Sequence, residues 1–197
     1  MNESELVESV VKYFSRWFDI RAEVWDDLKV GRIDLVMEDR VTGALFGVEC
    51  KHPEERRGKE IGDIVSQCTQ YSRLNFDGKR IPVFLCPALF QNKFCYADTR
   101  KLIDGQEWVK DKHDTQHIHH SFNSFLKNFN FGEIRKKLDH HNKPFYEFMY
   151  NNQRIYSTRK RWQSDDIQGL EKENYAMMIR NINQWEKQSR IFRISKP

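Results

Sequence analysis

Two carboxylates and an ammonium group in the first quarter of the chain could perform chemistry together: Asp34, Glu49 and Lys51. Lys51 follows Glu49 by two residues, and on a β-strand such residues point to the same face. Carboxylate oxygens bind Mg²⁺ or Mn²⁺, and such an ion polarises a phosphodiester and lowers the pKa of a bound water. A neighbouring ammonium can position that water or stabilise the charge of the transition state.

The residues around these side chains predict the strands that would hold them. Residues 31–38 alternate between apolar and polar types, as in a half-buried strand. Residues 40–43 supply a turn, and residues 44–51 form the partner strand of a hairpin. In this hairpin the side chain of Cys50 points into the core, and its backbone carbonyl is a further candidate metal ligand.

Flanking periodicities complete an α/β layout. Apolar spacings of three and four predict an amphipathic helix over residues 4–18 and a second one over residues 61–71. Residues 81–85 are apolar throughout, which indicates a strand buried on both faces. The predicted order is therefore helix, hairpin, helix and strand, with a mixed sheet.

This arrangement resembles the PD-(D/E)xK nuclease superfamily over residues 3–90, including the order of its core elements (helix, β-meander, helix, strand). The matching residues are Ile33-Asp34 on the first hairpin strand and Glu49-Cys50-Lys51 on the second. The chain has Ile33 where the family motif has Pro, a common variation that leaves the carboxylate in place.

The helix after the motif adds to the resemblance. Gln67 and Tyr71 have the Q-x-x-x-Y spacing of the RecB-like branch, in which the pair helps to hold the substrate strand and the catalytic Lys. One helical turn separates them, so both side chains can reach the same site. The His motif of that branch is missing upstream.

Members of the superfamily often carry another Glu on the first helix. Glu5 is preferred here by its place in the run Ser4-Glu5-Leu6-Val7. The alternatives are Glu3, Glu8 and Glu23.

The resemblance implies a restriction-endonuclease-like fold and a metal-dependent nuclease that hydrolyses phosphodiester bonds, with DNA as the expected substrate and Mg²⁺ or Mn²⁺ as cofactor. Residues 1–100 would form the nuclease core. Residues 101–197 would form a mainly helical extension that packs on the core or shapes the substrate groove. A phage or mobile-element nuclease fits this description, and a homodimer would suit an enzyme that cuts both strands.

The second half of the chain gives weaker patterns. Residues 104–120 are polar and rich in His and Lys, which predicts a long loop; a zinc site there lacks a familiar ligand set. Residues 121–138 are predicted to be helical, with a break at Gly132. Residues 145–156 predict a strand pair, and residues 168–188 a terminal helix.

Clusters of cations are candidates for nucleic-acid contact. One follows the catalytic strand, and a second lies beside Trp162. Their members are Arg56, Arg57 and Lys59, and Arg159, Lys160 and Arg161. A third cluster lies at residues 135–137. Each cluster alone is more often a solvated surface than a binding site, and a nuclease site at Asp34, Glu49 and Lys51 would reverse this preference for the cluster at residues 56–59.

Composition excludes several other classes. The chain has no phosphate-binding G-x-x-x-x-G-K-[ST] loop, no G-x-G-x-x-G motif and no pattern of a signal peptide or membrane span. Its four Cys residues form no C-x-x-C pair, which favours a reduced, cytoplasmic protein.

Residues 1–52 hold seven Lys and Arg against eleven Asp and Glu, whereas residues 151–197 hold ten against five. Such a division suits metal at one place and a polyanion at another. Three alternatives stay open: a non-catalytic nucleic-acid-binding protein on the same fold, a viral or mobile-element protein-interaction factor, and a surface hairpin with cross-strand ion pairs.

Overall fold

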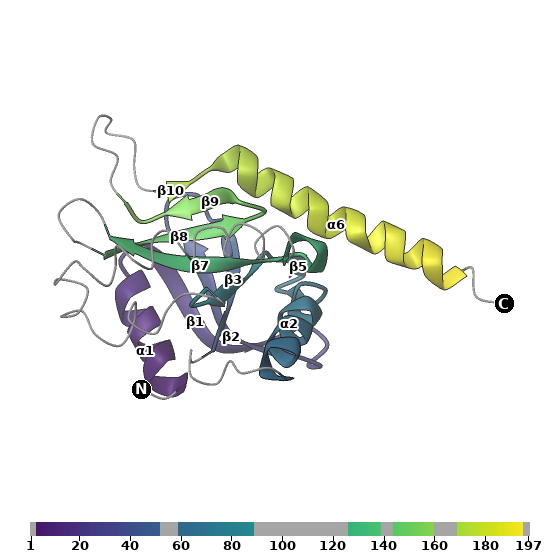
Figure 1. The fold of residues 1–197 in the computed structure, drawn as a ribbon, viewed down its shortest axis with the longest axis horizontal. Helices are drawn as coiled ribbons and strands as arrows, with labels where there is room; N and C mark the ends of the chain where they lie inside the picture. The colour runs from purple at the N-terminus through teal and green to yellow at the C-terminus, as the bar shows by residue number, and fades with distance from the viewer. Residues whose placement is uncertain (1–2, 52–58, 89–125, 139–143, 160–168, 195–197) are drawn as a thin grey trace.

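An eight-stranded mixed sheet forms the centre of the computed structural model, which describes residues 3–51, 59–88, 126–138, 144–159 and 169–194 (Figure 1). Its strands are β1 Phe18–Trp25, β2 Arg32–Asp39, β3 Leu45–Cys50, β6 Val83–Cys86, β7 Phe131–Leu138, β8 Pro144–Tyr150, β9 Gln153–Ser157 and β10 Gly169–Leu170. The strand order is β1-β2-β3-β6-β7-β8-β9-β10. The pairs β3–β6 and β6–β7 are parallel, and all the others are antiparallel.

Three helices and a small hairpin complete the described part of the chain. The helices are α1 Glu3–Phe14, α2 Lys59–Tyr71 and α6 Lys172–Ile194. The hairpin pairs β4 Asn75–Phe76 with β5 Lys79–Arg80, and the 3-10 turn η2 spans Lys127–Phe129. None of the helices within the described ranges is long and apolar enough to cross a membrane.

The sheet is strongly curled. Phe18 on β1 and Tyr156 on β9 are six strands apart in the sheet order, yet their ring centroids are 4.8 Å apart. The hydroxyl of Tyr156 also donates to Asp39 on β2, at 3.4 Å. The concave face therefore encloses an aromatic core, to which α1 contributes Leu6, Val10 and Phe14, and α6 contributes Met178 and Ile182.

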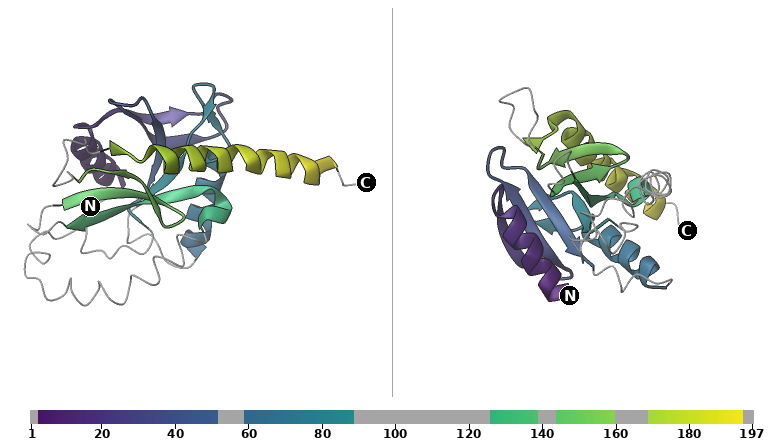
Figure 2. Two further views of the ribbon diagram at one scale, coloured as in Figure 1. Left: turned by 90° about the horizontal axis from the view of Figure 1, so that it is seen from above. Right: turned by 60° about the vertical axis from the view of Figure 1, so that its left-hand side comes forward.

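A second core lies on the other face of the sheet, where α2 packs. It joins Ile64, Cys68 and Tyr71 of α2 to Val83 and Leu85 of β6. The alternate β6 residues, Phe84 and Cys86, lie in the aromatic core. β6 is thus buried on both faces, as its apolar sequence predicts. Figure 2 shows α1 and α2 on different parts of the sheet, and α6 extending well beyond it.

The general α/β class with a mixed sheet, predicted from the sequence, is confirmed. The two-stranded hairpin of β2 and β3, the helix α2, the strand pair β8–β9 and the terminal helix α6 all occur where they were predicted, to within a few residues. The loop predicted at residues 104–120 and the proposed domain boundary near residue 100 lie outside the described residues.

The helix predicted over residues 121–138 is wrong for the part that the structure describes. After η2, Asn130 adopts a left-handed conformation with φ 59°, and the chain continues as β7. The sheet alternation was hidden because two inward-facing positions carry charges: Glu133 is fully buried and forms an ion pair with Arg135 at 2.6 Å. Within its described residues the C-terminal extension combines strands with a helix, because β7–β10 continue the sheet before α6 begins.

Gly132 does not break a helix; it allows close packing of strands. A Cβ at this position would lie 2.4 Å from the carbonyl oxygen of Met149 and 2.6 Å from the ring of Phe84. Real Cβ atoms do not approach backbone so closely, and a rigid core absorbs such a change poorly.

We expect Gly132→Ala to lower the free energy of unfolding by about 3 kcal/mol, measured by urea denaturation, because the added methyl group must push β7 from β8. Gly62→Ala is the matched control. Nothing lies within 4 Å of a Cβ on Gly62, which lies in α2, so this change should stabilise the protein by up to about 1 kcal/mol. Equal effects of the two changes would contradict the packing argument.

Candidate metal centre

The hairpin of β2 and β3 places Asp34 and Glu49 on neighbouring strands. The backbone N–H of Cys50 donates to Oδ2 of Asp34 at 2.6 Å, so the aspartate is tied to the strand that carries the glutamate. Just past β3, the N–H of Lys51 donates to the carbonyl of Cys86 at 3.0 Å. These bonds fix the backbone positions from which the Asp34, Glu49 and Lys51 side chains extend.

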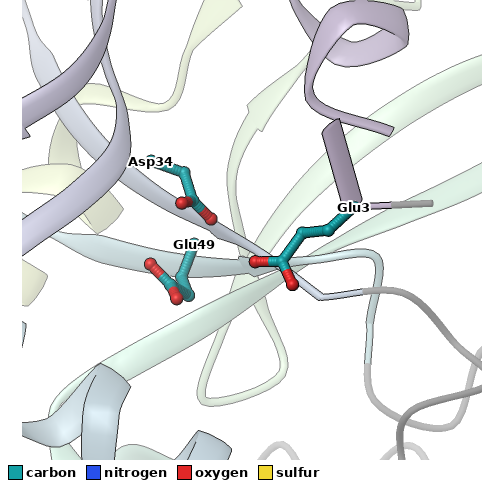
Figure 3. Close-up of side chains that lie close together, drawn as sticks. All are labelled: Glu3, Asp34 and Glu49. Carbon is teal, nitrogen blue, oxygen red and sulfur yellow. The ribbon is translucent and has the colours of Figure 1, made fainter. Parts of the chain in front are cut away.

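A third carboxylate reaches the same place from the first turn of α1. Glu3, Asp34 and Glu49 each contribute one oxygen to a group in which all the oxygens lie within 4.8 Å of one another (Figure 3). Glu3 stands three residues before Leu6 and therefore on the helix face that Leu6, Val10 and the rest of the buried stripe define. The core contacts of α1 thus bring Glu3 to the site.

The ammonium of Lys51 lies among these carboxylates. Its Nζ is 2.7 Å from Oε1 of Glu3 and 3.0 Å from Oε1 of Glu49. Glu49 is only 1% exposed, and among the described residues neither of its carboxylate oxygens accepts a hydrogen bond of good geometry. The contact with Lys51 is therefore an ion pair that leaves the hydrogen-bonding capacity of Glu49 largely unused.

Burial and mutual repulsion disturb the ionisation of the cluster. Burial, reinforced by the charge of Asp34, raises the pKa of Glu49 to about 7 despite the nearby ammonium. Burial also raises the pKa of Asp34, although the Cys50 N–H and Lys51 oppose this. For Lys51, burial acts to lower the pKa, but Glu49 and Glu3 outweigh it and hold the pKa above its ordinary value. Lys51 is therefore a permanent cation here.

The residues fit a divalent cation on two grounds. Three carboxylates against one ammonium leave a formal charge of −2 when all are ionised, which one such ion would neutralise. Oxygens bound to one Mg²⁺ are about 2.9 to 4.2 Å apart, given metal–oxygen distances near 2.1 Å. Oxygens within 4.8 Å need only small side-chain rotations to reach this spacing. Glu3, Asp34 and Glu49 would be the ligands.

The α2 helix supports the cluster from the side. The amide Nε2 of Gln67 donates to the hydroxyl of Tyr71 at 2.8 Å, so these residues form the pair that their spacing predicts. Burial raises the pKa of Tyr71, and the charges of Glu49 and Asp34 raise it further, which indicates that its hydroxyl lies near the carboxylates. Gln67 therefore holds the hydroxyl of Tyr71, whose pKa the charges of the carboxylates raise.

Several predicted site residues lie elsewhere. Glu5 and Glu8 are exposed on α1 and do not belong to the carboxylate group, so the carboxylate of α1 that lies with Asp34 and Glu49 is that of Glu3 and not that of the preferred Glu5. Glu23 pairs with Arg32 at 3.3 Å. The side chain of Cys50 is fully buried in the aromatic core, as predicted, whereas its carbonyl as a metal ligand stays a prediction.

The predicted basic clusters are only partly described. Lys59 is the first residue of α2, and the other members of its cluster, Arg56 and Arg57, lie outside the described residues. Of the second cluster only Arg159 is described: its guanidinium lies 5.2 Å from the ring centroid of Phe145. Lys160 and Arg161 lie outside the described residues.

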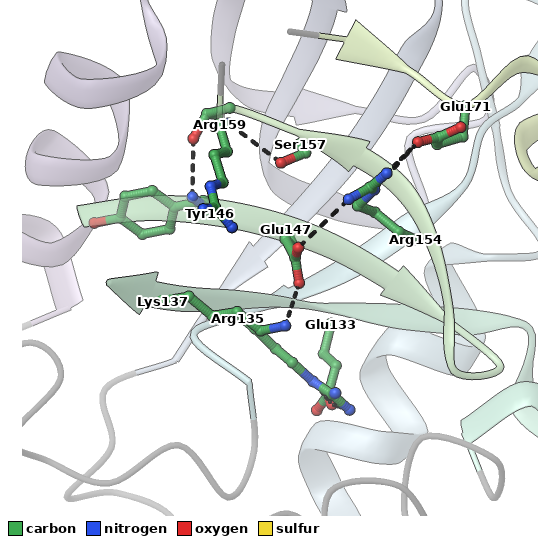
Figure 4. Close-up of polar contacts among 10 residues, drawn as sticks. Glu133, Arg135, Lys137, Tyr146, Glu147, Arg154, Ser157, Arg159 and Glu171 are labelled. Atoms are coloured by element: carbon green, nitrogen blue, oxygen red, sulfur yellow. Dashed lines mark hydrogen bonds and ion pairs between the residues drawn. The ribbon is translucent and has the colours of Figure 1, made fainter. Parts of the chain in front are cut away.

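Two of the cations of residues 135–137, Arg135 and Lys137, form ion pairs on the sheet (Figure 4). Lys137 contacts Glu147 at 2.5 Å, and the same carboxylate is 3.8 Å from Arg154, which also pairs with Glu171 at 2.5 Å. Arg135 is held by Glu133. These contacts stabilise the pairing of neighbouring strands and give this cluster a structural role.

Comparison with protein-family models, with curated proteins and with solved structures finds no match to this chain. The class that the fold itself defines is an α/β protein with a curled mixed sheet and a partly buried acidic cluster at one end of the β2–β3 hairpin.

Proposed function

We propose that this protein is a divalent-metal-dependent nuclease that hydrolyses phosphodiester bonds, with DNA as its substrate. The observation that supports this most is the convergence of three carboxylates and one ammonium within a few ångströms, on consecutive strands and the first helix. A surface hairpin with cross-strand ion pairs would not bury a glutamate to 1% exposure beside two more carboxylates.

Each side chain has a distinct role in this proposal. Asp34, Glu49 and Glu3 hold Mg²⁺ or Mn²⁺, which when bound activates a water and polarises the phosphodiester. Lys51, held as a cation, donates to the attacking water or to a phosphoryl oxygen and stabilises the negative charge that develops there. Tyr71 and Gln67 contact the substrate strand beside the metal.

The proposal includes a restriction-endonuclease-like core of the PD-(D/E)xK type. The order α1, β1–β2–β3, α2, β6 agrees with that core, and β3 carries the Glu-x-Lys at its end. Glu3 takes the place of the first-helix glutamate that members often have.

Metal binding gives the first test. We expect calorimetry to detect Mn²⁺ binding that Asp34→Asn weakens by more than about tenfold, because it removes one ligand charge while keeping an acceptor for the Cys50 N–H. Asp19→Asn is the control, since that carboxylate is 70% exposed on β1. The metal-loaded wild type should cut single- or double-stranded DNA, whereas RNA serves as the comparison substrate.

The outcomes separate the rival classes. Binding of both metal and DNA without any cleavage would favour the non-catalytic nucleic-acid-binding protein. If neither metal nor nucleic acid binds, the nuclease proposal is overturned and the protein-interaction factor is favoured.

A further inference from the structure

The turn between β1 and β2 presents large apolar side chains to solvent. Within the described residues four such side chains are strongly exposed, and three of them belong to this turn: Trp25 at 54%, Leu28 at 81% and Val30 at 63%. Soluble proteins expose single apolar residues freely, but a cluster of this kind marks a contact surface.

The turn is rigidly constructed. Asp26 is 3% exposed, and its carboxylate accepts the N–H groups of Leu28 at 3.0 Å and of Val30 and Gly31 at 2.7 Å each. These bonds overcome the effect of burial and lower the pKa of Asp26, which keeps the carboxylate ionised. The exposed side chains therefore project from a backbone already ordered, which reduces the entropy lost on binding.

Further bonds fasten the turn to the β4–β5 hairpin. The N–H of Asp27 donates to the carbonyl of Asn75 at 2.9 Å, and the N–H of Gly78 donates to the carboxylate of Asp27 at 2.9 Å. Both bonds are made by Asp27, and they keep the exposed face of the turn in one orientation relative to the hairpin.

The turn also lies next to the carboxylate cluster. A Cβ on Gly31 would be 3.2 Å from the ring of Tyr71, so the end of the turn packs on the residue whose pKa Glu49 and Asp34 raise. Arg32, the residue after Gly31, lies with its guanidinium carbon 5.9 Å from the ring centroid of Trp25. The positive charge of Arg32 also acts to lower the pKa of Asp34, with a smaller effect than burial, the Cys50 N–H, Lys51 and Glu3.

Distances along β2 match the spacing of nucleotides. Strand residues rise about 3.3 Å each, so the Trp25–Arg32 pair lies about 7 Å along β2 from Asp34. Stacked nucleotides repeat every 3.4 Å along a strand, so this pair is about two nucleotides from a phosphate at the metal. Val30 lies in the turn at the end of the strand.

We propose that the β1–β2 turn is a base-stacking platform for the substrate: Trp25, backed by Arg32, stacks on an unpaired base near the scissile phosphate, and Leu28 and Val30 contact the next bases. This inference rests on the proposed nuclease function and deepens it, because it assigns a substrate with an unpaired strand. An aromatic ring stacks on any base, so the platform reads strandedness rather than sequence. The cations of Arg32 and Lys29 suit the phosphates between the stacked bases.

The test measures binding and cleavage separately. Single-stranded oligonucleotides that carry 2-aminopurine at successive positions are titrated with Asp34→Asn protein, and their fluorescence is compared with that of the same protein carrying Trp25→Ala. We expect quenching at one or two positions, its loss with Trp25→Ala, and oligonucleotide binding about 5- to 100-fold weaker. In the cleaving protein, Trp25→Ala should raise KM and leave kcat within about twofold, and Trp25→Phe should restore most of the binding.

Val41 provides a matched control. It is 66% exposed in the turn at the opposite end of β2, so Val41→Ala removes a similar apolar surface far from the site and should change neither constant. Leu28→Ala should weaken the binding of single-stranded oligonucleotides and leave the thermal unfolding temperature unchanged.

Each result decides the proposal. If the wild type cleaves DNA and Trp25→Ala binds and cuts like wild type, the platform is wrong while the nuclease function stands. If the wild type binds no nucleic acid, the stacking platform and the nuclease function are both wrong. If Leu28→Ala abolishes a concentration-dependent dimer in light scattering and leaves nucleic-acid binding unchanged, the turn is a contact between copies of the chain, and the platform is overturned.

Discussion

Lys51→Ala is expected to reduce DNA cleavage by about a hundredfold to ten-thousandfold, the range seen when a positioned donor or acid–base group is lost, while Mn²⁺ binding persists. The ammonium is 2.7 Å from Glu3 and 3.0 Å from Glu49. It therefore competes with a metal for carboxylate oxygens. Its removal should leave the affinity for Mn²⁺ equal or higher, even though the chemical step fails.

The opposite effects on metal binding and cleavage distinguish catalysis from structural support. If Lys51 only balanced charge, a metal would replace it, and the loaded variant would be as active as wild type. If Lys51 only held the fold, the variant would lose metal binding and melt early. The nuclease proposal alone predicts a stable, metal-binding and inactive protein.

The variants are chosen to keep the fold testable. Lys51 is 17% exposed and its partner Glu49 is buried, so its loss can destabilise the metal-free protein by some kcal/mol. Lys51→Met retains the packing of the aliphatic stem and is measured beside Lys51→Ala, both with Mn²⁺ present. Lys12→Ala, at an exposed position of α1, is the control and should cut normally. Robust cleavage by Lys51→Ala would sink the assignment.

Much of the fold could be predicted because its strands have strong and simple patterns. The hairpin alternates between its two faces, and β6 is apolar at every position. β7 could not be recognised in this way, since the ion pair of Glu133 and Arg135 puts charges where a buried strand has apolar residues. The two charges compensate each other only in the folded structure, so strand propensities read from the sequence do not reveal the pair.

Part of the candidate site could likewise be predicted from the sequence, and part of it could not. Strand alternation was enough to place Glu49 beside Lys51, and helical spacing to pair Gln67 with Tyr71. The third carboxylate depended on how α1 packs. Glu3 and Glu5 are about 200° apart around a helix, so only one of them can lie on the buried side.

A pattern that could have identified the third carboxylate was nevertheless present. The apolar stripe of Leu6, Val10 and Phe14 extends one turn back to Glu3 rather than to Glu5. The roles of the basic clusters could not be predicted in this way, because a cluster of cations can form ion pairs within the protein or bind a ligand.

Glu49→Gln is expected to remove most of the decrease in the free energy of unfolding that the metal-free protein shows as the pH rises from about 5 to 8. Burial raises the pKa of Glu49 from 4.5 to about 7 in the folded state. Between these values the native state retains a proton that the unfolded chain has lost, so stability falls as the pH rises through that window. At 1.36 kcal/mol for each pKa unit, the loss is up to about 3 kcal/mol and is complete above pH 7.

The measurement is the unfolding free energy in urea at pH 5 and pH 8, with chelator present. Because glutamine carries no charge at either pH, Glu49→Gln should match wild type near pH 5 and exceed its stability by up to about 3 kcal/mol at pH 8. Glu23→Gln, whose carboxylate is 69% exposed, is the control and should follow wild type at both values. Parallel profiles for wild type and Glu49→Gln would show that Glu49 does not ionise near neutral pH.

Adding Mn²⁺ should reverse the order of the two proteins at pH 8. A ligand at a thousand times its Kd stabilises the folded state by about 4.1 kcal/mol, which exceeds the deficit of about 3 kcal/mol, and the wild type gains this because the ion neutralises the charge that burial opposes. Glu49→Gln should gain much less, since it has lost a ligand. Equal stabilisation of both proteins would mean that the ion binds elsewhere. The carboxylate cluster would then only lower the stability of the fold. If the ion binds as proposed, the buried glutamate lowers the stability of the empty protein and supplies a metal ligand, which is the exchange of stability for function expected of a functional site.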